Sequence, residues 1–330
     1  MPKTIYDIAK AAGVSIATVS RVFNSSNSVK ESTRDKVLAI ADEMDYHPQA
    51  YAQGLASKKK NSIMMLVPVM SNYFFTEILK GTQDILANHN FELNIVNINQ
   101  EKGAFKQVEQ IIKRHWADGY LLVSLHLKDK DIKKLKRYNV PISLLDDFTT
   151  HFDSVAFDNE KGAYMATDYL VKKGYQRIMF LSGRSDAIPV IHRLKGYKQA
   201  LKEHNIPFDD KLVIKGKSME RDGFTEKSGY EAMQKLLTSE IEADACFCTS
   251  DIKAIGAQKA LREHGIKMPL ISYDNLTISE YIELTTIHQP IYNMGYKATE
   301  LLLNRIEKPN AKISDEILSP KLIIRSSSEV

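Results

Sequence analysis

The sequence is poor in cysteine and has no long apolar run. Its 330 residues include one tryptophan and two cysteines, Cys246 and Cys248. So few cysteines exclude a disulfide-stapled scaffold, and no apolar stretch approaches the ~18 residues of a membrane-spanning helix. No signal-peptide core lies near the start, so we expect the chain to stay in the cytoplasm. Without further ligands at zinc spacing, the two cysteines are interpreted as reduced thiols in a buried strand.

Motifs of catalysis are also missing. The chain has no Gly-x-Ser-x-Gly element, no phosphate-binding loop and no metal-ligand cluster. Its histidines, cysteines and acids show no nucleophile–base spacing. We therefore expect no enzyme, no catalytic residues, no cofactor and no metal site.

What the sequence does contain is an ordinary globular composition with an uneven charge. Hydrophobic residues make up 43% and charged residues 26% of the chain, as in soluble globular proteins. The length suggests about two domains. The first 60 residues hold nine Lys and Arg against six Asp and Glu, a net charge of +3, whereas the whole chain carries +4. This N-terminal excess is compatible with contacts to phosphates.

A short capped helix is predicted at the N-terminus. Thr4 and Asp7 have the spacing of a capping box, and residues 5–12 place apolar side chains on one helical face. Gly13 ends this helix.

Two more helices are predicted after the glycine. Ser15 caps the first of them, over residues 17–24, and Ser32 or Thr33 caps the other, over about 33–45. Two short helices joined by a tight turn with glycine form a helix-turn-helix. The alternative is a plain three-helix bundle that contacts another protein.

In a helix-turn-helix, the N-terminal residues of the second helix face base edges in the major groove. That places Ile16, Ala17 and Arg21 at the bases, since Arg is the commonest reader of guanine. The predicted phosphate contacts are Ser15, Thr18, Ser20 and Asn24.

These residues carry a family resemblance. The segments TIYDIA, AGVS and TVSRV at 4–9, 12–15 and 18–22 resemble the N-terminal signature of the LacI/GalR family of bacterial regulators. The match continues through Val29, Thr33, Arg34, Val37 and the Tyr-His-Pro of 46–48. The resemblance implies a DNA-binding headpiece over 1–48, in which Thr4 and Tyr6 are further DNA contacts.

Residues 49–60 are the predicted hinge segment. They are helix-compatible, but Gly54 costs roughly 1 kcal/mol relative to alanine, and so short a helix is marginal in water. In the family this segment folds only on DNA, in the minor groove. Leu55 matches the leucine that wedges between base pairs, and Ala52 is a predicted DNA contact. The alternative is a flexible linker ending in three solvated lysines, 58–60.

The remainder, 61–330, is the predicted effector-binding and dimerisation domain. Its strands are predicted at 63–69, 93–98, 120–125, 142–145, 178–181, 212–214, 245–248 and 270–273, and its helices at 77–87, 162–173, 194–204, 230–237, 252–264 and 294–306. Such alternation is typical of parallel sheets covered on both faces. The fold class is therefore α/β, a helix-turn-helix domain followed by a domain that resembles the two-subdomain periplasmic-binding-protein fold.

In that fold the chain passes between the subdomains near 158–162, 288–292 and 320. The N-subdomain then comprises about 61–160 and 290–320, and the C-subdomain about 161–289 and 321–330. Ligands bind in the cleft, outside the carboxyl ends of the strands.

The predicted effector contacts match family pocket positions, most of them just after strands. They are Asn72, Tyr73, Phe74, Ser124, Asp146, Arg193, Phe224, Ser250, Asp274 and Gln289. Carboxylates and Arg bond hydroxyl groups, and an aromatic face packs on sugar C–H groups, so a sugar or sugar derivative is the expected effector. The alternatives are helix caps for Asp251 and Asp274 and core positions for Tyr73 and Phe74.

The resemblance also implies a partner arrangement. Two headpieces read a palindromic, double-stranded DNA operator only in a homodimer, and the chain has no heptad-repeat tail of the tetrameric relatives. Closure of the cleft is expected to shift the N-subdomains and change the spacing of the hinge segments, and the coupling with DNA must be reciprocal. The expected function is repression of a carbohydrate-utilisation operon.

Four alternatives stay open. An exported solute-binding protein shares the fold, although the headpiece argues against it. An enzyme would be supported by turnover of a sugar, and a purine-type regulator by a purine co-repressor. A catabolite-control regulator would use a phosphorylated phosphocarrier protein. The element Gln-Pro-Ile-Tyr at 289–292 fits such relatives, but Glu300 stands where they carry the arginine that meets the phosphoserine.

Overall fold

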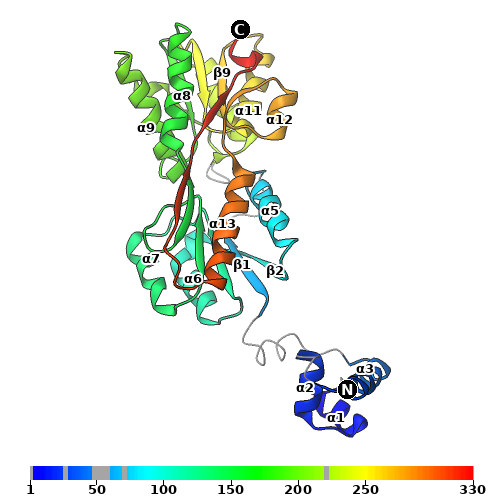
Figure 1. The fold of residues 1–330 in the computed structure, drawn as a ribbon. Coiled ribbons are helices and arrows are strands. Elements are labelled where there is room, and N and C mark those ends of the chain that lie inside the picture. The colour runs from blue at the N-terminus through cyan, green and yellow to red at the C-terminus, as the bar shows by residue number, and fades with distance from the viewer. Residues whose placement is uncertain (1–2, 25–28, 47–59, 69–72, 219–222, 330) are drawn as a thin grey trace.

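The protein is described by a computed structural model that covers residues 3–24, 29–46, 60–68, 73–218 and 223–329. Figure 1 shows a module of three short helices and two α/β lobes. The chain starts in the helical module and ends in the lobe drawn at the top.

The helical module has a small apolar core. Its helices are α1 (Ile5–Ala12), α2 (Ile16–Asn24) and α3 (Glu31–Glu43). They bury Ile8, Ala9, Ala12, Val19, Val22, Val37 and Ala41 against one another. These residues recur at helical spacing, which is why a short sequence can hold three helices together.

Local capping defines the helix-turn-helix. The Asp7 carboxylate accepts hydrogen bonds of 2.8 Å from both the backbone N–H and the hydroxyl of Thr4, which confirms the capping box. Gly13 adopts φ 67°, in the left-handed region that suits glycine. The Ser15 hydroxyl then accepts from the Thr18 N–H at 3.1 Å, as predicted for the cap of α2.

The predicted cap of α3 is wrong. The helix starts at Glu31 with Lys30 as its N-cap, so Ser32 and Thr33 lie inside it. The Lys30 carbonyl already accepts from the N–H of Thr33. Glu31 forms an ion pair with Arg34 (3.6 Å) and places a negative charge in the first turn, where the helix dipole favours it.

The first lobe contains a six-stranded sheet in the order β11-β5-β4-β3-β1-β2, with every pair parallel. The strands are β1 (Ser62–Val67), β2 (Glu92–Asn97), β3 (Gly119–Val123), β4 (Ile142–Leu145), β5 (Asp153–Phe157) and β11 (Asp315–Leu318). The helices of this lobe are α5 (Tyr73–Leu86), α6 (Ala104–Lys113), α7 (Asp129–Leu135) and α13 (Ile291–Glu307). β1 is buried along its whole length, as expected of a central parallel strand.

The second lobe repeats this plan, with the order β12-β10-β9-β8-β6-β7 and only β12 antiparallel to its neighbour among the described strands. The strands are β6 (Ile178–Ser182), β7 (Val213–Lys215), β8 (Ala245–Cys248), β9 (Leu270–Asp274), β10 (Thr285–His288) and β12 (Lys321–Ile323). The helices are α8 (Asn159–Lys172), α9 (Ile188–Glu203), α10 (Glu226–Leu237), α11 (Asp251–Glu263) and α12 (Thr277–Tyr281). Short 3₁₀ turns lie at Gln100–Lys102, Lys136–Tyr138, Asp210–Leu212 and Ser326–Ser328.

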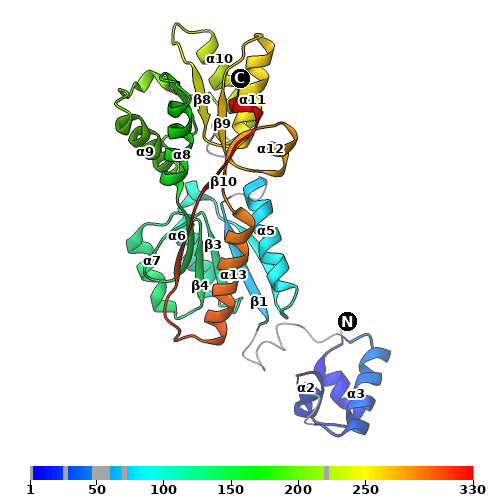
Figure 2. The same ribbon diagram turned by 45° about the horizontal axis from the view of Figure 1, so that its top comes forward.

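The chain passes between the lobes three times: from β5 to α8, from β10 to α13, and from β11 to β12. Figure 2 shows these passages side by side in the narrow region between the two lobes, which we call the waist. β5 ends where the chain enters the second lobe, and β10 ends where it returns. The carboxyl ends of the two sheets therefore face each other across the waist, which is the edge where ligands bind in such sheets.

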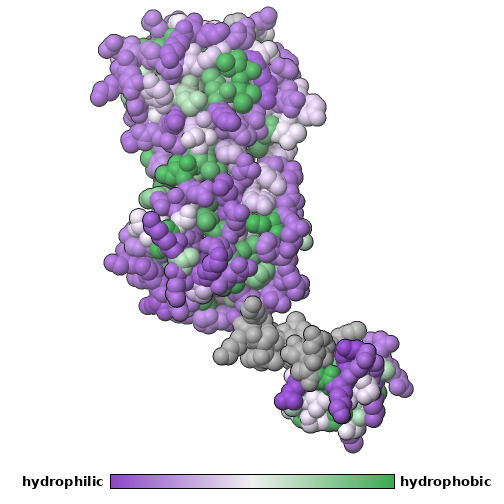
Figure 3. Space-filling view, in the orientation of Figure 1, coloured by the Kyte–Doolittle hydropathy of each residue, from purple (hydrophilic) through white to green (hydrophobic). Residues whose placement is uncertain are grey.

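The surface drawn in Figure 3 is mainly hydrophilic, with separate apolar patches on the lobes and at the waist. In the part of the chain that the structure describes, no helix has both the length and the apolar character needed to span a bilayer.

Candidate functional site

A buried arginine is the centre of the waist. Arg193, on α9, is only 4% exposed. Its Nε donates to Asn159 Oδ1 (2.9 Å), one terminal nitrogen donates to the Thr249 carbonyl oxygen, and the other donates to Gln289 Oε1 (3.3 Å). The guanidinium also stacks on the ring of Tyr273 at 3.6 Å. One planar fork thus joins residues from α8, β9, the end of β8 and the β10–α13 passage.

A carboxylate completes this arrangement. Asp274 Oδ1 lies 3.7 Å from a terminal nitrogen of Arg193. Burial raises the pKa of Asp274 well above its ordinary value, while Arg193 opposes the shift and the negative charges of Asp251 and Asp146 add to it. Asp146 belongs to the first lobe, so its influence places the two carboxylates near each other across the waist.

Asp146 is held by a neighbouring hydroxyl. Ser124, just beyond β3, donates to Asp146 Oδ2 at 2.7 Å. Ser124, Asp146, Asp274 and Asn275 all have positive φ, at 47°, 58°, 114° and 56°. Left-handed backbone at residues other than glycine is unfavourable and gathers at binding sites. Both sheets carry this feature at their facing ends.

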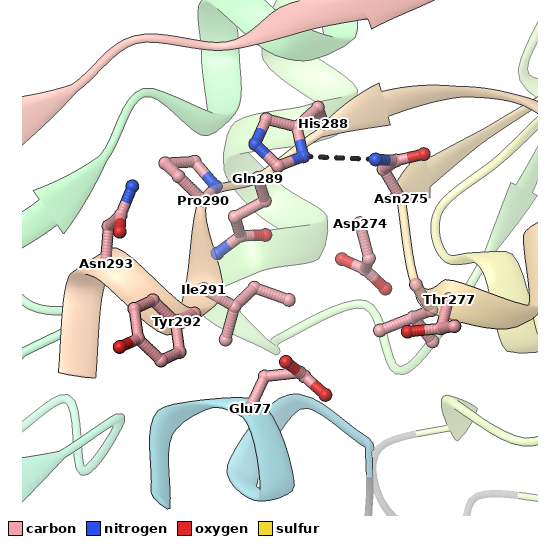
Figure 4. Close-up of a pocket in the computed structure, with 11 residues that line it drawn as sticks. Glu77, Asp274, Asn275, Thr277, His288, Gln289, Pro290, Ile291, Tyr292 and Asn293 are labelled. Atoms are coloured by element: carbon pink, nitrogen blue, oxygen red, sulfur yellow. Dashed lines mark hydrogen bonds between the residues drawn. The ribbon is translucent and has the colours of Figure 1, made fainter. Parts of the chain in front are cut away.

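A pocket of about 210 Å³ opens beside the arginine. Figure 4 shows Asp274 and Thr277 entering it from the second lobe, Gln289 and Ile291 from the passage between the lobes, and Glu77 from α5 of the first lobe. The Asn275 amide lies 3.2 Å from His288 Nδ1 at its rim. The volume is below the range typical of drug-sized ligands, which suits a small polar ligand.

One buried carboxylate near the pocket has a structural role. Asp251 accepts hydrogen bonds from the hydroxyls of Ser272, Ser279 (2.6 Å) and Thr286 (2.7 Å) and from the Leu276 N–H (2.7 Å). Burial raises the pKa of Asp251, and these donors oppose the shift. Asp251 therefore ties α11 to β9, β10 and α12.

The helical module presents an exposed face of α2. Val19 and Val22 point into the core, whereas Ile16, Ala17 and Arg21 are exposed. Ala17 and Arg21 are one turn apart and share an exposed face of the helix, with Ile16 and Ala17 in its first turn and Arg21 in its last. Tyr6, on α1, is 66% exposed.

Comparisons with known proteins match both the helical module and the two-lobed domain. Residues 4–49 match the model described as "Bacterial regulatory proteins, lacI family", and residues 60–326 match "Periplasmic binding proteins and sugar binding domain of LacI family". The chain belongs to the LacI family. It is a DNA-binding transcription regulator.

LacI-family relatives match along their whole length. Catabolite control protein A of Priestia megaterium is 32% identical over 100% of both chains, and the HTH-type transcriptional repressor PurR of Vibrio atlanticus is 32% identical over 98% of both. A Lac repressor dimer bound to operator and the anti-inducer ONPF superposes with TM-score 0.81, at 25% identity over 99% of both chains. The complex of the regulator CelR with cellobiose gives 0.70, at 27% identity over 98% of this chain and 99% of that one.

The structure brings some predicted effector residues together. Arg193, Asp274 and Gln289 are in direct contact, and Ser124 and Asp146 form a pair on the facing lobe.

The other predicted effector residues lie around this centre. Phe224 is half-buried in the second lobe, and Ser250 is buried as the N-cap of α11, accepting from the Lys253 N–H at 3.3 Å. Tyr73 is 55% exposed at the start of α5, and Phe74 is half-buried with its ring edge-on to Phe75.

Some of the predicted site residues lie outside the described residues, and others have a different role. Ala52, Leu55 and Asn72 lie outside them, as does the side chain of Asn24. Ser15, directly before α2, is exposed and shares a hydrogen bond of 2.9 Å with the hydroxyl of Thr18, while Thr18 and Ser20 on the helix are half-buried. Thr4 is exposed at the start of α1. Neither Asp251 nor Asp274 is a helix cap, because Ser250 caps α11 and Leu276 precedes α12.

Sequence analysis did not select several residues that hold Arg193 or line the pocket. Asn159 and Thr249 hold the arginine, and Glu77, Asn275 and His288 line the pocket. The strand-end rule would have selected Asn275, which follows β9 directly. Nothing in a single sequence marks the backbone carbonyl of Thr249.

The metal-ligating residue types form no site in the described ranges. No group of three or more His, Cys, Asp or Glu side chains there is arranged to hold a metal ion. Cys246 and Cys248 are buried free thiols with their sulfurs 3.6 Å apart, and burial raises the pKa of Cys248.

Proposed function

We propose that the chain is a homodimeric repressor of carbohydrate-utilisation genes. A small sugar-like ligand bound at the waist controls its affinity for a palindromic operator. The observation that carries this proposal is the Arg193 fork. It joins Asn159 of α8, Gln289 of the β10–α13 passage and Asp274 of β9 at the point where the lobes meet. A ligand that contacts this fork interacts with the elements that connect the lobes.

The chemistry of the waist suits a polyol. The guanidinium has five N–H groups, of which three donate to Asn159, Thr249 and Gln289, so others remain to meet ligand hydroxyls. The carboxyls of Asp146 and Asp274 accept hydroxyl hydrogens from either lobe. CelR is described with cellobiose, and a regulator from Enterococcus faecium with bound ribose, at TM-scores of 0.70 and 0.71. These neighbours support a sugar as the ligand class.

The DNA-binding half of the proposal rests on α2. Ile16, Ala17 and Arg21 are free to face base edges, and Ser15 at the start of the helix is placed to meet a phosphate. Closure of the lobes would change the separation of the two headpieces in a dimer, and DNA would in turn change the affinity for the ligand by the same factor.

We infer binding without chemical conversion. Among the described residues, the polar groups around the pocket are hydrogen-bonded to one another, as Arg193 is to Gln289 and Asn275 to His288, and are not arranged as a nucleophile beside a base. The curated relatives named above are regulators as well.

A regulator that uses a phosphorylated phosphocarrier protein is the closest alternative. Glu300 is exposed on α13, and its charge raises the pKa of Lys297, so it lies near that lysine. A carboxylate on this face repels a phosphoserine. Tighter operator binding in the presence of the phosphorylated carrier would support the alternative instead.

The experiment combines a ligand screen with a DNA titration. Thermal shifts of the purified protein are measured with sugars, sugar phosphates and purines, because a ligand that binds the folded state raises the melting temperature. Each ligand that stabilises is then added to a fluorescence anisotropy titration with palindromic fragments from the same genome. We expect at least one sugar-like compound to change operator affinity. Indifference to every fragment, with and without ligands, would refute the proposal.

A further inference from the structure

Lys253 is a buried cation for which the described residues offer no matching carboxylate. It lies in the first turn of α11 and is 0% exposed. Its ammonium nitrogen is 3.3 Å from the Thr249 hydroxyl and 5.2 Å from the centre of the Phe224 ring. In the described chain, no carboxylate oxygen comes within the 4.0 Å of an ion pair with it. The nearest carboxylate along the chain, Asp251, is occupied by the four donors described above.

The surroundings of this lysine make its charge unfavourable. A buried ammonium without a charge partner loses its hydration with nothing to replace it, and the N-terminal turn of a helix disfavours a cation further. Burial lowers the pKa of Lys253 to about 7, and the positive charge of Arg193 contributes to this. A methionine of similar size would fill the same space without this difficulty.

The lysine and Arg193 meet at one residue. Thr249 follows β8 at the edge of the sheet that faces the first lobe. Its hydroxyl contacts Lys253 and donates to the Leu181 carbonyl of β6, while its own carbonyl accepts from Arg193. Two cations thus gather at the carboxyl ends of two parallel strands, beside the N-termini of α10 and α11. The position is complementary to an anion.

We propose that the ligand at the waist carries an anionic group, a phosphate or a carboxylate, which Lys253 and Arg193 bind together. This inference rests on the proposed function, because it specifies the class of the same ligand. The half-buried ring of Phe224 covers the ammonium group and must rotate for direct contact. The bound anion then supplies the missing charge partner, so the charged form of Lys253 is stabilised in the complex.

The test compares neutral sugars with their anionic derivatives. Dissociation constants are measured for glucose, glucose 6-phosphate and gluconate, and for ribose and ribose 5-phosphate, on the wild type, Lys253→Met and Lys259→Met. Lys259 is an exposed lysine on the same helix and serves as the matched control. We expect an anionic member to bind at least about tenfold more tightly than its neutral parent. Lys253→Met should abolish this preference and Lys259→Met should keep it.

A pH series provides a second readout. Binding an anion should hold a proton on Lys253, so affinity for the phosphate should fall about tenfold per pH unit above about 7 in the wild type but not in Lys253→Met. The ionisable groups that act on the lysine are Arg193, Cys246 and Cys248, and Asp251 in turn acts on Cys248. The buried thiol of Cys248 has a raised pKa, so it stays protonated over this range.

Four outcomes would overturn the inference. If a neutral sugar binds and its phosphate or acid does not, or if Lys253→Met keeps the anionic preference, the ligand class is wrong while the proposed function stands. If no small molecule of either kind changes operator binding, the proposed function fails as well. Lys253→Met should also raise the melting temperature of the ligand-free protein. A lower one would show that the protein itself supports the lysine, against the inference.

Discussion

Replacing Arg193 with methionine tests whether the fork holds the second lobe together. Methionine keeps most of the volume, so the change removes charge and hydrogen bonds without opening a large cavity. The lost contacts are the hydrogen bonds to Asn159, Thr249 and Gln289 and the stack on Tyr273 at 3.6 Å.

The size of the effect follows from burial. Breaking a buried ion pair by removing one partner costs about 3–5 kcal/mol. Asp274 is the carboxylate left behind, and because its pKa is already raised by burial, it can take up a proton instead of remaining charged. The loss should therefore lie at the lower end, about 3 kcal/mol. At roughly 2–4 °C per kcal/mol for a domain of this size, the melting temperature should fall by about 6–12 °C.

The assay is thermal and urea unfolding of Arg193→Met beside Lys195→Met. Lys195 lies on the same helix with its side chain 71% exposed, and its ion pair with Glu160 is a surface contact. The control should change the free energy of unfolding by no more than about 0.5 kcal/mol. Equal stabilities of the two variants would refute the reasoning, because they would show that the buried hydrogen bonds contribute nothing net.

Three further substitutions test other parts of the molecule. Arg21→Ala should weaken binding to the cognate operator by about 1–3 kcal/mol in anisotropy titrations, and an equal loss on unrelated DNA would make it a phosphate contact. Burial raises the pKa of Asp147 to about 6, with His126 opposing. The folded protein then holds this proton more tightly than the unfolded chain, so stability should fall as the pH rises from about 4 to 6; Asp147→Asn should remove that fall, and an unchanged pH profile would count against it. Asp251→Asn cannot accept from all four donors and should lose about 3 kcal/mol in urea unfolding, whereas a loss under about 1 kcal/mol would show that the network can rearrange.

Helix ends were predicted correctly from the sequence where neighbouring residues alone determine them. The first helix has its predicted ends, 5–12, because the Thr4–Asp7 box and Gly13 are determined by neighbouring residues. The start of α3 was misplaced because several residues there are able to cap, and the choice depends on how the helix packs.

Two of the strands absent from the prediction, β5 and β10, share a physical cause. β5 begins with Asp153, which is buried only because Arg305 on α13 binds it at 2.9 Å through two nitrogens. β10 contains Thr285 and Thr286, whose hydroxyls bond Ser328 and Asp251. Polar residues in a buried strand look like loop until partners far away in the sequence are known.

The residues of the candidate site also fall into those that the sequence predicted and those that depend on distant packing. Asp274 and Gln289 were selected because they lie at a strand end and at a passage between the lobes, a rule that needs only topology, whereas Arg193 was selected because it matches a pocket position of the family. The burial of Lys253 was not foreseen, since its position on α11 carries no periodic signal of its own. Its contacts with Thr249 and Phe224 depend on the packing of α10 and β8.

The three passages between the lobes also have a mechanical consequence. A force that pulls the lobes apart is carried by three polypeptide segments in parallel, so each bears only part of the load, and a protease that severs one leaves the other two intact. Three neighbouring tethers resist stretching and twisting far more than bending. We therefore expect any relative motion of the lobes to be a rotation about an axis that runs through the three passages.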